Sequence, residues 1–115
     1  MTNNFTDSAK FKITVGDIDY IAEFDVDSLE ETVKRGALDE SQNLIFTTIP
    51  LILYGSLKKN QPNITPSAAA QLWTDMRNEG YTVTDFTQTI GSEFNRLVGE
   101  RFFGSTETKK KIVKM

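Results

Sequence analysis

Residues 10–26 read KFKITVGDIDYIAEFDV, and apolar and polar side chains alternate on both sides of the Gly16-Asp17 pair. A period of two predicts two β-strands that each bury one face, and a Gly-Asp pair suits the tight two-residue turn of a hairpin. We therefore expect a β-hairpin with an acidic outer face. Because a lone hairpin is only marginally stable in water, the segments that follow must cover its apolar side.

The segments after the hairpin carry helix signals. Asp27 with Glu30 three residues later has the spacing of a capping box, and Gly36 suits the end of a short helix. Asp39 with Gln42 repeats the capping spacing ahead of an apolar stretch, so a second helix is expected there. Helices after an N-terminal hairpin indicate the α+β class.

The apolar stretch 44–57 predicts the central buried helix. Pro50 lies inside it and has no amide proton for a bond one turn back, so we expect a kink there, with a new helix start as the alternative. Polar residues interrupt the stretch, which is shorter than the ~20 residues that a membrane span requires. Lys58, Lys59 and Asn60 are expected to close this helix.

Two further helices are predicted downstream. Thr65-Pro66 combines a capping hydroxyl with a proline at the first helical position, and Gly80 suits the end of that helix. Thr84-Asp85 predicts the start of a fourth helix. Apolar residues at helical spacing form their buried faces: Ala69, Leu72, Trp73 and Met76 on the third, and Phe86, Ile90, Phe94, Leu97 and Val98 on the fourth, with Phe102 and Phe103 extending the stripe.

Together these segments predict one α+β domain over 10–104, in which an N-terminal β-hairpin is followed by about four helices packed as a small helical bundle. A chain of 115 residues is long enough for one core and too short for two. Residues 1–9 are polar and 105–115 are polar and basic, so both ends are expected to be flexible. The N-terminal residues also lack the basic start and apolar run of a signal peptide.

The composition argues against several classes of function. Cysteine and histidine are both absent, which removes disulfides, thiolate nucleophiles, imidazole bases and the usual zinc ligand sets. A net charge of -3 and a pI near 4.9 give no global attraction for nucleic acid. No glycine-rich phosphate loop occurs, and each carboxylate lies on a predicted polar face. We expect a soluble, non-enzymatic protein with no catalytic residue, no cofactor and no metal.

An acidic cluster is the strongest charge feature of the sequence. Its carboxylates follow a strand and a helix start and lack the spacing of a calcium-binding loop, so they are interpreted as a solvated face. The run 109–111, three lysines, is likewise interpreted as solvated. The members of the cluster are Asp17, Asp19, Glu23, Asp25, Asp27, Glu30 and Glu31.

The candidate partner-binding residues are apolar and mostly aromatic, because aromatic side chains carry much of the binding energy of protein interfaces. Phe102 and Phe103 are adjacent and lie next to the polar tail, which suits an exposed contact. Trp73, Phe94 and Leu97 complete the set, and core packing is the default interpretation for Trp73 and Phe94.

The order of these segments resembles the tail assembly chaperones of long-tailed, siphovirus-type bacteriophages. The similarity covers roughly residues 10–98 and includes the phrase Asn63-Ile64-Thr65-Pro66, which opens a helix that ends near Gly80. The resemblance implies a protein that binds the apolar, helical tape measure protein in the host cytoplasm, keeps it soluble and helps to recruit tail tube subunits. It also implies absence from the mature virion and leaves room for self-association.

Two other functions are compatible with the same residues. A small connector or tail-completion subunit would stay in the virion, whereas an acidic inhibitor would bind a host protein through the cluster between Asp17 and Glu31. The three lysines at 109–111 also suggest a hypothesis at the level of the gene, since an adenine run that encodes them permits ribosomal frameshifting into a longer product. An interrupted run, or no downstream frame, would rule this out.

Overall fold

The computed structural model describes residues 8–41 and 43–103, and the expectations for residues 1–7 and 104–115, including the lysine run, lie outside the described residues. The fold begins with the antiparallel strands β1 (Phe11–Val15) and β2 (Ile18–Ala22). Val15 pairs with Ile18, so Gly16-Asp17 is the two-residue turn, and Gly16 has a φ of +62° that favours glycine. The predicted hairpin is confirmed.

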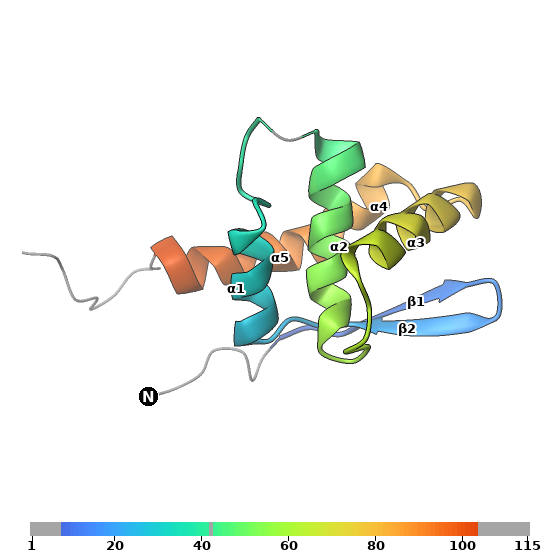
Figure 1. Ribbon diagram of the computed structural model, residues 1–115, viewed down its shortest axis with the longest axis horizontal. Coiled ribbons are helices and arrows are strands. Elements are labelled where there is room, and N and C mark those ends of the chain that lie inside the picture. The colour runs from blue at the N-terminus through green and yellow to red at the C-terminus, as the bar shows by residue number, and fades with distance from the viewer. Residues whose placement is uncertain (1–7, 42, 104–115) are drawn as a thin grey trace, which may run out of the picture.

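Helices follow the hairpin and pack as a small bundle beside it (Figure 1), which confirms the α+β fold class. Helix α2 stands at the centre, where it contacts α1, α3, α5 and β2. The helices within the described residues are α1 (Val26–Lys34), η2 (Leu44–Thr48), α2 (Ile49–Lys58), α3 (Pro66–Asn78), α4 (Val83–Gln88), α5 (Ile90–Val98) and η3 (Gly99–Phe103), where η marks π-helical geometry. No described helix is long and apolar enough to cross a membrane.

The core forms around α2 because nearly every side of this helix is covered. Leu53 and Leu57 have no exposed surface, and Leu29 of α1 is equally buried. Gly55 lies where α2 passes α1: a Cβ at this position would lie 1.7 Å from Oγ1 of Thr32. A glycine at 55 therefore allows the close approach of the two helices.

Both outer edges of the hairpin are capped by side chains from the helical part. The Gln61 side chain accepts from the Ile21 amide at 3.0 Å and donates to the Ile21 carbonyl at 3.0 Å. On the other edge, the Tyr81 hydroxyl accepts from the Thr14 amide at 3.2 Å and donates to the Thr14 carbonyl at 3.0 Å. Capped in this way, neither edge offers these backbone groups to another strand.

Two helix starts differ from the predicted ones. Asp25, not Asp27, caps α1, because the Asp25 carboxylate accepts from the Ser28 amide at 2.8 Å and the Ser28 hydroxyl accepts from the Asp25 amide. Thr82 caps α4 in a reciprocal capping box with Asp85, so Thr84 lies inside the helix. In each case several polar residues compete for one position, and spacing alone does not select among them.

The central apolar segment also begins differently. Asn43, not Asp39, caps it: the Asn43 side chain accepts from the amides of Ile45 and Phe46. The expected kink inside one α-helix is replaced by a change of helix type, since the π-helical η2 ends at Thr48 and Pro50 is the second residue of α2. A proline in the first turn of an α-helix is tolerated because its amide would have no partner there.

The predicted fourth helix is divided at Thr89, whose φ of -116° and ψ of -88° are not helical. The break separates α4 from α5 and lets each helix follow its own direction along the core. The apolar stripe is nevertheless buried as predicted, with Phe86, Ile90, Phe94, Leu97 and Val98 all at 4% exposure or less. The ends predicted for the first and third helices at Gly36 and Gly80 are confirmed by positive φ angles at both glycines.

Candidate functional site

Three of the five candidate partner-binding residues lie in the core. Trp73, Phe94 and Leu97 are 2%, 1% and 1% exposed. The Trp73 ring packs edge-on against Phe86 with 5.5 Å between centroids, and the Phe94 ring lies 5.7 Å from that of Phe24. In this conformation their role is packing, and they present no surface to a partner.

Phe102 is the candidate that the structure leaves accessible, at 42% exposure. It lies in η3, which is tied to α1 by an ion pair of 2.7 Å between Arg101 and Glu30. Phe102 is therefore held on a helical turn and not on a loose end. Phe103 belongs to the same turn, but its side chain lies outside the described residues.

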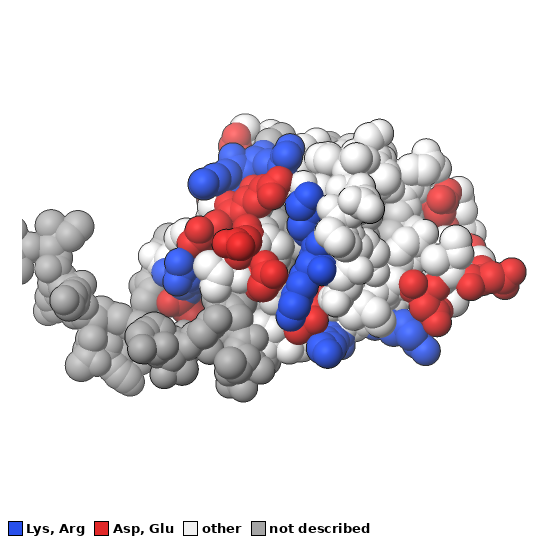
Figure 2. Space-filling view, turned by 60° about the horizontal axis from the view of Figure 1, so that its bottom comes forward, with Lys and Arg blue, Asp and Glu red and all other residues white. Residues whose placement is uncertain are grey.

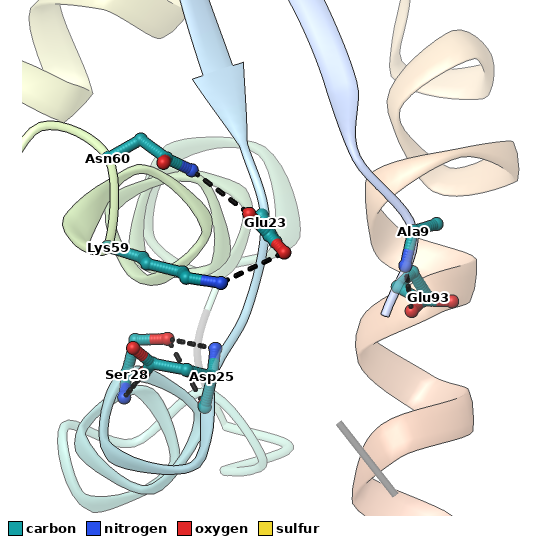
Figure 3. Close-up of polar contacts among 7 residues, drawn as sticks. All are labelled: Ala9, Glu23, Asp25, Ser28, Lys59, Asn60 and Glu93. Atoms are coloured by element: carbon teal, nitrogen blue, oxygen red, sulfur yellow. Dashed lines mark hydrogen bonds and ion pairs between the residues drawn. The ribbon is translucent and has the colours of Figure 1, made fainter. Parts of the chain in front are cut away.

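The acidic cluster is not a uniformly solvated face. Glu23 is only 7% exposed and its carboxylate accepts from Lys59 at 3.0 Å and from Asn60 at 3.3 Å (Figure 3). Burial alone would raise the pKa of Glu23, but the hydrogen bonds and charges of these partners hold it below its ordinary value. The expectation that each carboxylate lies on a polar face is thus wrong for Glu23.

Other members of the cluster are also engaged. Glu31 accepts from the Tyr54 hydroxyl at 2.8 Å and from Arg35 at 3.0 Å, and these two hydrogen bonds, that of Tyr54 first, lower the pKa of Glu31. Figure 2 shows acidic and basic side chains lying side by side on this face. Pairing of this kind weakens the field that an acidic inhibitor would use to bind a basic surface.

Glu93 is a second buried carboxylate that the sequence did not reveal. It is 8% exposed and pairs with Arg96 at 2.9 Å. It also accepts from the Ala9 amide at 2.9 Å, as Figure 3 shows. The contact joins Ala9, two residues before β1, to α5, 84 positions away. A Glu-x-x-Arg spacing on a helix signals an ion pair, but only the fold brings Ala9 to it.

Sequence reasoning missed three exposed apolar side chains, one shortly before the central segment and two in its first turn. Leu38, Leu44 and Phe46 are 41%, 50% and 70% exposed. The expectation that the whole stretch 44–57 is buried is therefore wrong for its first turn. Asn43 is the signal that could have found it, because a strong N-cap there places the next residues in a helix start, ahead of the buried turns.

The described surface carries exposed apolar side chains that a partner protein could contact. Within residues 8–41 and 43–103, no three histidine, cysteine, aspartate or glutamate residues are grouped to hold a metal ion. The buried carboxylates, Glu23 and Glu93, are engaged by structural partners. Exposed leucine and phenylalanine side chains can supply apolar contact area where they lie together on the surface, and the Phe46 ring also lies 5.8 Å from the Arg77 guanidinium.

The chain was also compared with known proteins. No protein-family model, no curated protein and no solved structure matches it.

Proposed function

We propose that this protein is a non-enzymatic tail assembly chaperone of a long-tailed bacteriophage. In this proposal it binds the tape measure protein in the host cytoplasm, keeps it soluble, helps to recruit tail tube subunits and leaves before the virion is complete. The proposal rests on the resemblance of residues 10–98 to that family and on the surface chemistry of the folded chain.

The observation that carries the proposal is the exposure of large aromatic side chains on the two short π-helical segments, η2 and η3. Phe46, at 70%, is the most exposed large apolar residue of the described chain, and Phe102 is 42% exposed on the anchored turn η3. When a partner covers an exposed aromatic side chain, a large apolar area is removed from water, and this lowers the free energy of the complex. A protein that shields an apolar helical partner needs surfaces of this kind.

Co-expression with the phage tape measure protein tests the proposal. We expect the tape measure protein to become soluble and to co-purify with this chain. Phe102→Asp and Phe46→Asp are expected to weaken recovery of the complex, because a carboxylate would be desolvated in the contact. Circular dichroism of each variant checks that the fold is kept.

Ile18→Asp is the matched control. Ile18 is 57% exposed at the hairpin turn, so the substitution adds the same charge to an exposed apolar position on another element. Recovery should stay at the wild-type level in this variant. A tape measure protein that stays insoluble with the wild-type chain overturns the proposal.

Mass spectrometry of purified virions separates the chaperone from a connector or tail-completion subunit. A chaperone is absent from finished particles, whereas a connector is retained in fixed stoichiometry. Finding this chain in virions while the tape measure protein stays insoluble would replace the chaperone with the structural subunit.

A further inference from the structure

A groove lies between the segment after α1 and the first turn of the central helix. Two adjacent depressions, with volumes of about 160 and 370 Å³, share the lining residues Ala37, Leu38, Leu44 and Thr48. We call them together the Leu38–Leu44 groove. The smaller depression is lined by the core residues Ile49, Ile52, Phe86 and Phe94, together with Thr87, Gly91 and Asn95.

The walls of this groove are accessible and held in place. Leu38 and Leu44 are 41% and 50% exposed. Leu44 begins η2, whose first amides are capped by the Asn43 side chain, and Asp39 accepts from the Ser41 amide at 2.9 Å. π-Helical turns are rare and occur frequently at functional sites.

The charge at the groove has one sign. Asp39 and Glu40 line the larger depression, and the described lining residues of both depressions include no lysine or arginine. Hydrogen bonds from the Ser41 amide and hydroxyl stabilise the ionised form of Asp39. A partner with apolar and basic side chains would complement both features.

The geometry favours a helix as the occupant over a strand. An added strand needs the free backbone groups of a strand edge, and the described lining residues of the groove include none from β1 or β2. A helix satisfies its own backbone hydrogen bonds and requires only apolar contact, which the apolar lining residues of the groove supply.

We propose that the Leu38–Leu44 groove binds an amphipathic helix of a partner protein, with an apolar side chain of that helix between Leu38 and Leu44. Lysine or arginine residues of the helix lie beside Asp39 and Glu40. The inference deepens the proposed function and rests on it, since a tape measure segment of this pattern is the expected partner.

Synthetic helices test the groove directly. The probe is a leucine and lysine peptide of about 18 residues with leucine at helical spacing, and the comparison peptide replaces every lysine with glutamate. We expect the leucine and lysine peptide to bind the full chain in isothermal titration calorimetry and to shift the NMR methyl signals of Leu38 and Leu44. The glutamate peptide should bind at least about tenfold more weakly.

Variants assign the binding to this surface. Leu44→Asp and Leu38→Asp are each expected to lower the affinity for the leucine and lysine peptide by about tenfold or more. Ile18→Asp should leave that affinity within about twofold of the wild-type value. Glu40→Lys should weaken binding most at low salt, and Asp17→Lys, at the hairpin turn, serves as its control. The inference is overturned if both leucine variants keep the wild-type affinity for the peptide. It is also overturned if Ile18→Asp loses as much affinity as the leucine variants do.

The same variants separate the groove from the proposed function. If the wild-type chain solubilises the tape measure protein and Leu44→Asp does so equally well, the groove is refuted and the chaperone function stands. If the peptide binds at Leu44 but the tape measure protein stays insoluble, the groove stands and the chaperone function is refuted.

Discussion

The indole N–H of Trp73 donates a hydrogen bond of 3.1 Å to the backbone carbonyl of Ile45. In the π-helical turn η2 the amides of Thr48 and Ile49 bond to the carbonyls five residues earlier, and the next amide in this series would be that of residue 50. Residue 50 is proline and has no amide proton, so the Ile45 carbonyl is left for a side chain. Trp73 thus joins α3 to the point where the helix type changes.

Replacing Trp73 with phenylalanine should lower the free energy of unfolding by about 2 kcal/mol, because it removes this donor and leaves a small cavity beside Phe86. Urea unfolding followed by circular dichroism measures the loss. In a Pro50→Ala background residue 50 regains an amide near Ile45, so the cost of Trp73→Phe should fall by about 1 kcal/mol. Additive effects of the two substitutions would contradict this account.

Gly55→Ala should destabilise the fold by about 2–3 kcal/mol, because the new methyl group would meet Oγ1 of Thr32 at 1.7 Å and force α1 and α2 apart. Thermal unfolding provides the measurement. Gly99→Ala is the matched control, since a Cβ there meets nothing within 4 Å and the backbone is helical. The control should leave stability unchanged or raise it by up to about 1 kcal/mol, because alanine favours a helical backbone more than glycine does. Equal losses in both variants would exclude crowding as the cause.

The two edge caps of the hairpin should be separable by hydrogen exchange. Gln61→Ala frees the Ile21 amide and is expected to speed its exchange by about tenfold, while the Thr14 amide keeps its wild-type rate. Tyr81→Phe should give the reverse pattern, because it removes only the hydroxyl that contacts Thr14. If either substitution speeds both amides alike, the hairpin opens as a unit and the caps do not act locally.

Acid should destabilise the protein in part through Glu93. Burial raises the pKa of Glu93, but hydrogen bonds from Arg96 and the Ala9 amide outweigh it and hold the pKa below the ordinary value of 4.5. A carboxyl whose pKa is lower in the folded state stabilises the fold above pH 4.5, and this contribution is lost as the pH falls through the folded-state pKa.

The matching variant is Glu93→Gln, which is less stable than the wild type at neutral pH and approaches it in acid. Urea unfolding at a series of pH values on both sides of 4.5 measures the difference. Parallel pH profiles for the two proteins would show that Glu93 contributes nothing to the acid sensitivity.

Local signals predicted much of this fold because each depends on neighbouring residues only. The alternation around Gly16-Asp17 predicted the hairpin and its register, and Thr65-Pro66 predicted the start of α3, where the Thr65 hydroxyl accepts from the Ala68 amide. Periods of two and of 3.6 residues, cap chemistry and a glycine at a helix end act over a few positions.

The candidate site was predicted less well, since exposure depends on which faces meet in space. Helical spacing placed Trp73, Phe94 and Leu97 on apolar faces, but the same pattern serves a core and an interface equally. Phe102 was the predicted residue with exposed surface, whereas Leu38, Leu44 and Phe46 were not predicted to be exposed.

The sequence by itself determined the fold class, the hairpin and the segments that become helical, because these follow from short-range periodicity and capping. The tertiary structure alone showed that Asp25 and Thr82, and not their polar neighbours, cap α1 and α4. It also showed that the fourth helix breaks at Thr89 and that Glu23 and Glu93 are buried with partners. The caps are chosen among several polar residues within one turn, where spacing alone does not select. The buried carboxylates depend instead on contacts between residues far apart in the chain, such as Ala9 with Glu93, which local patterns do not encode.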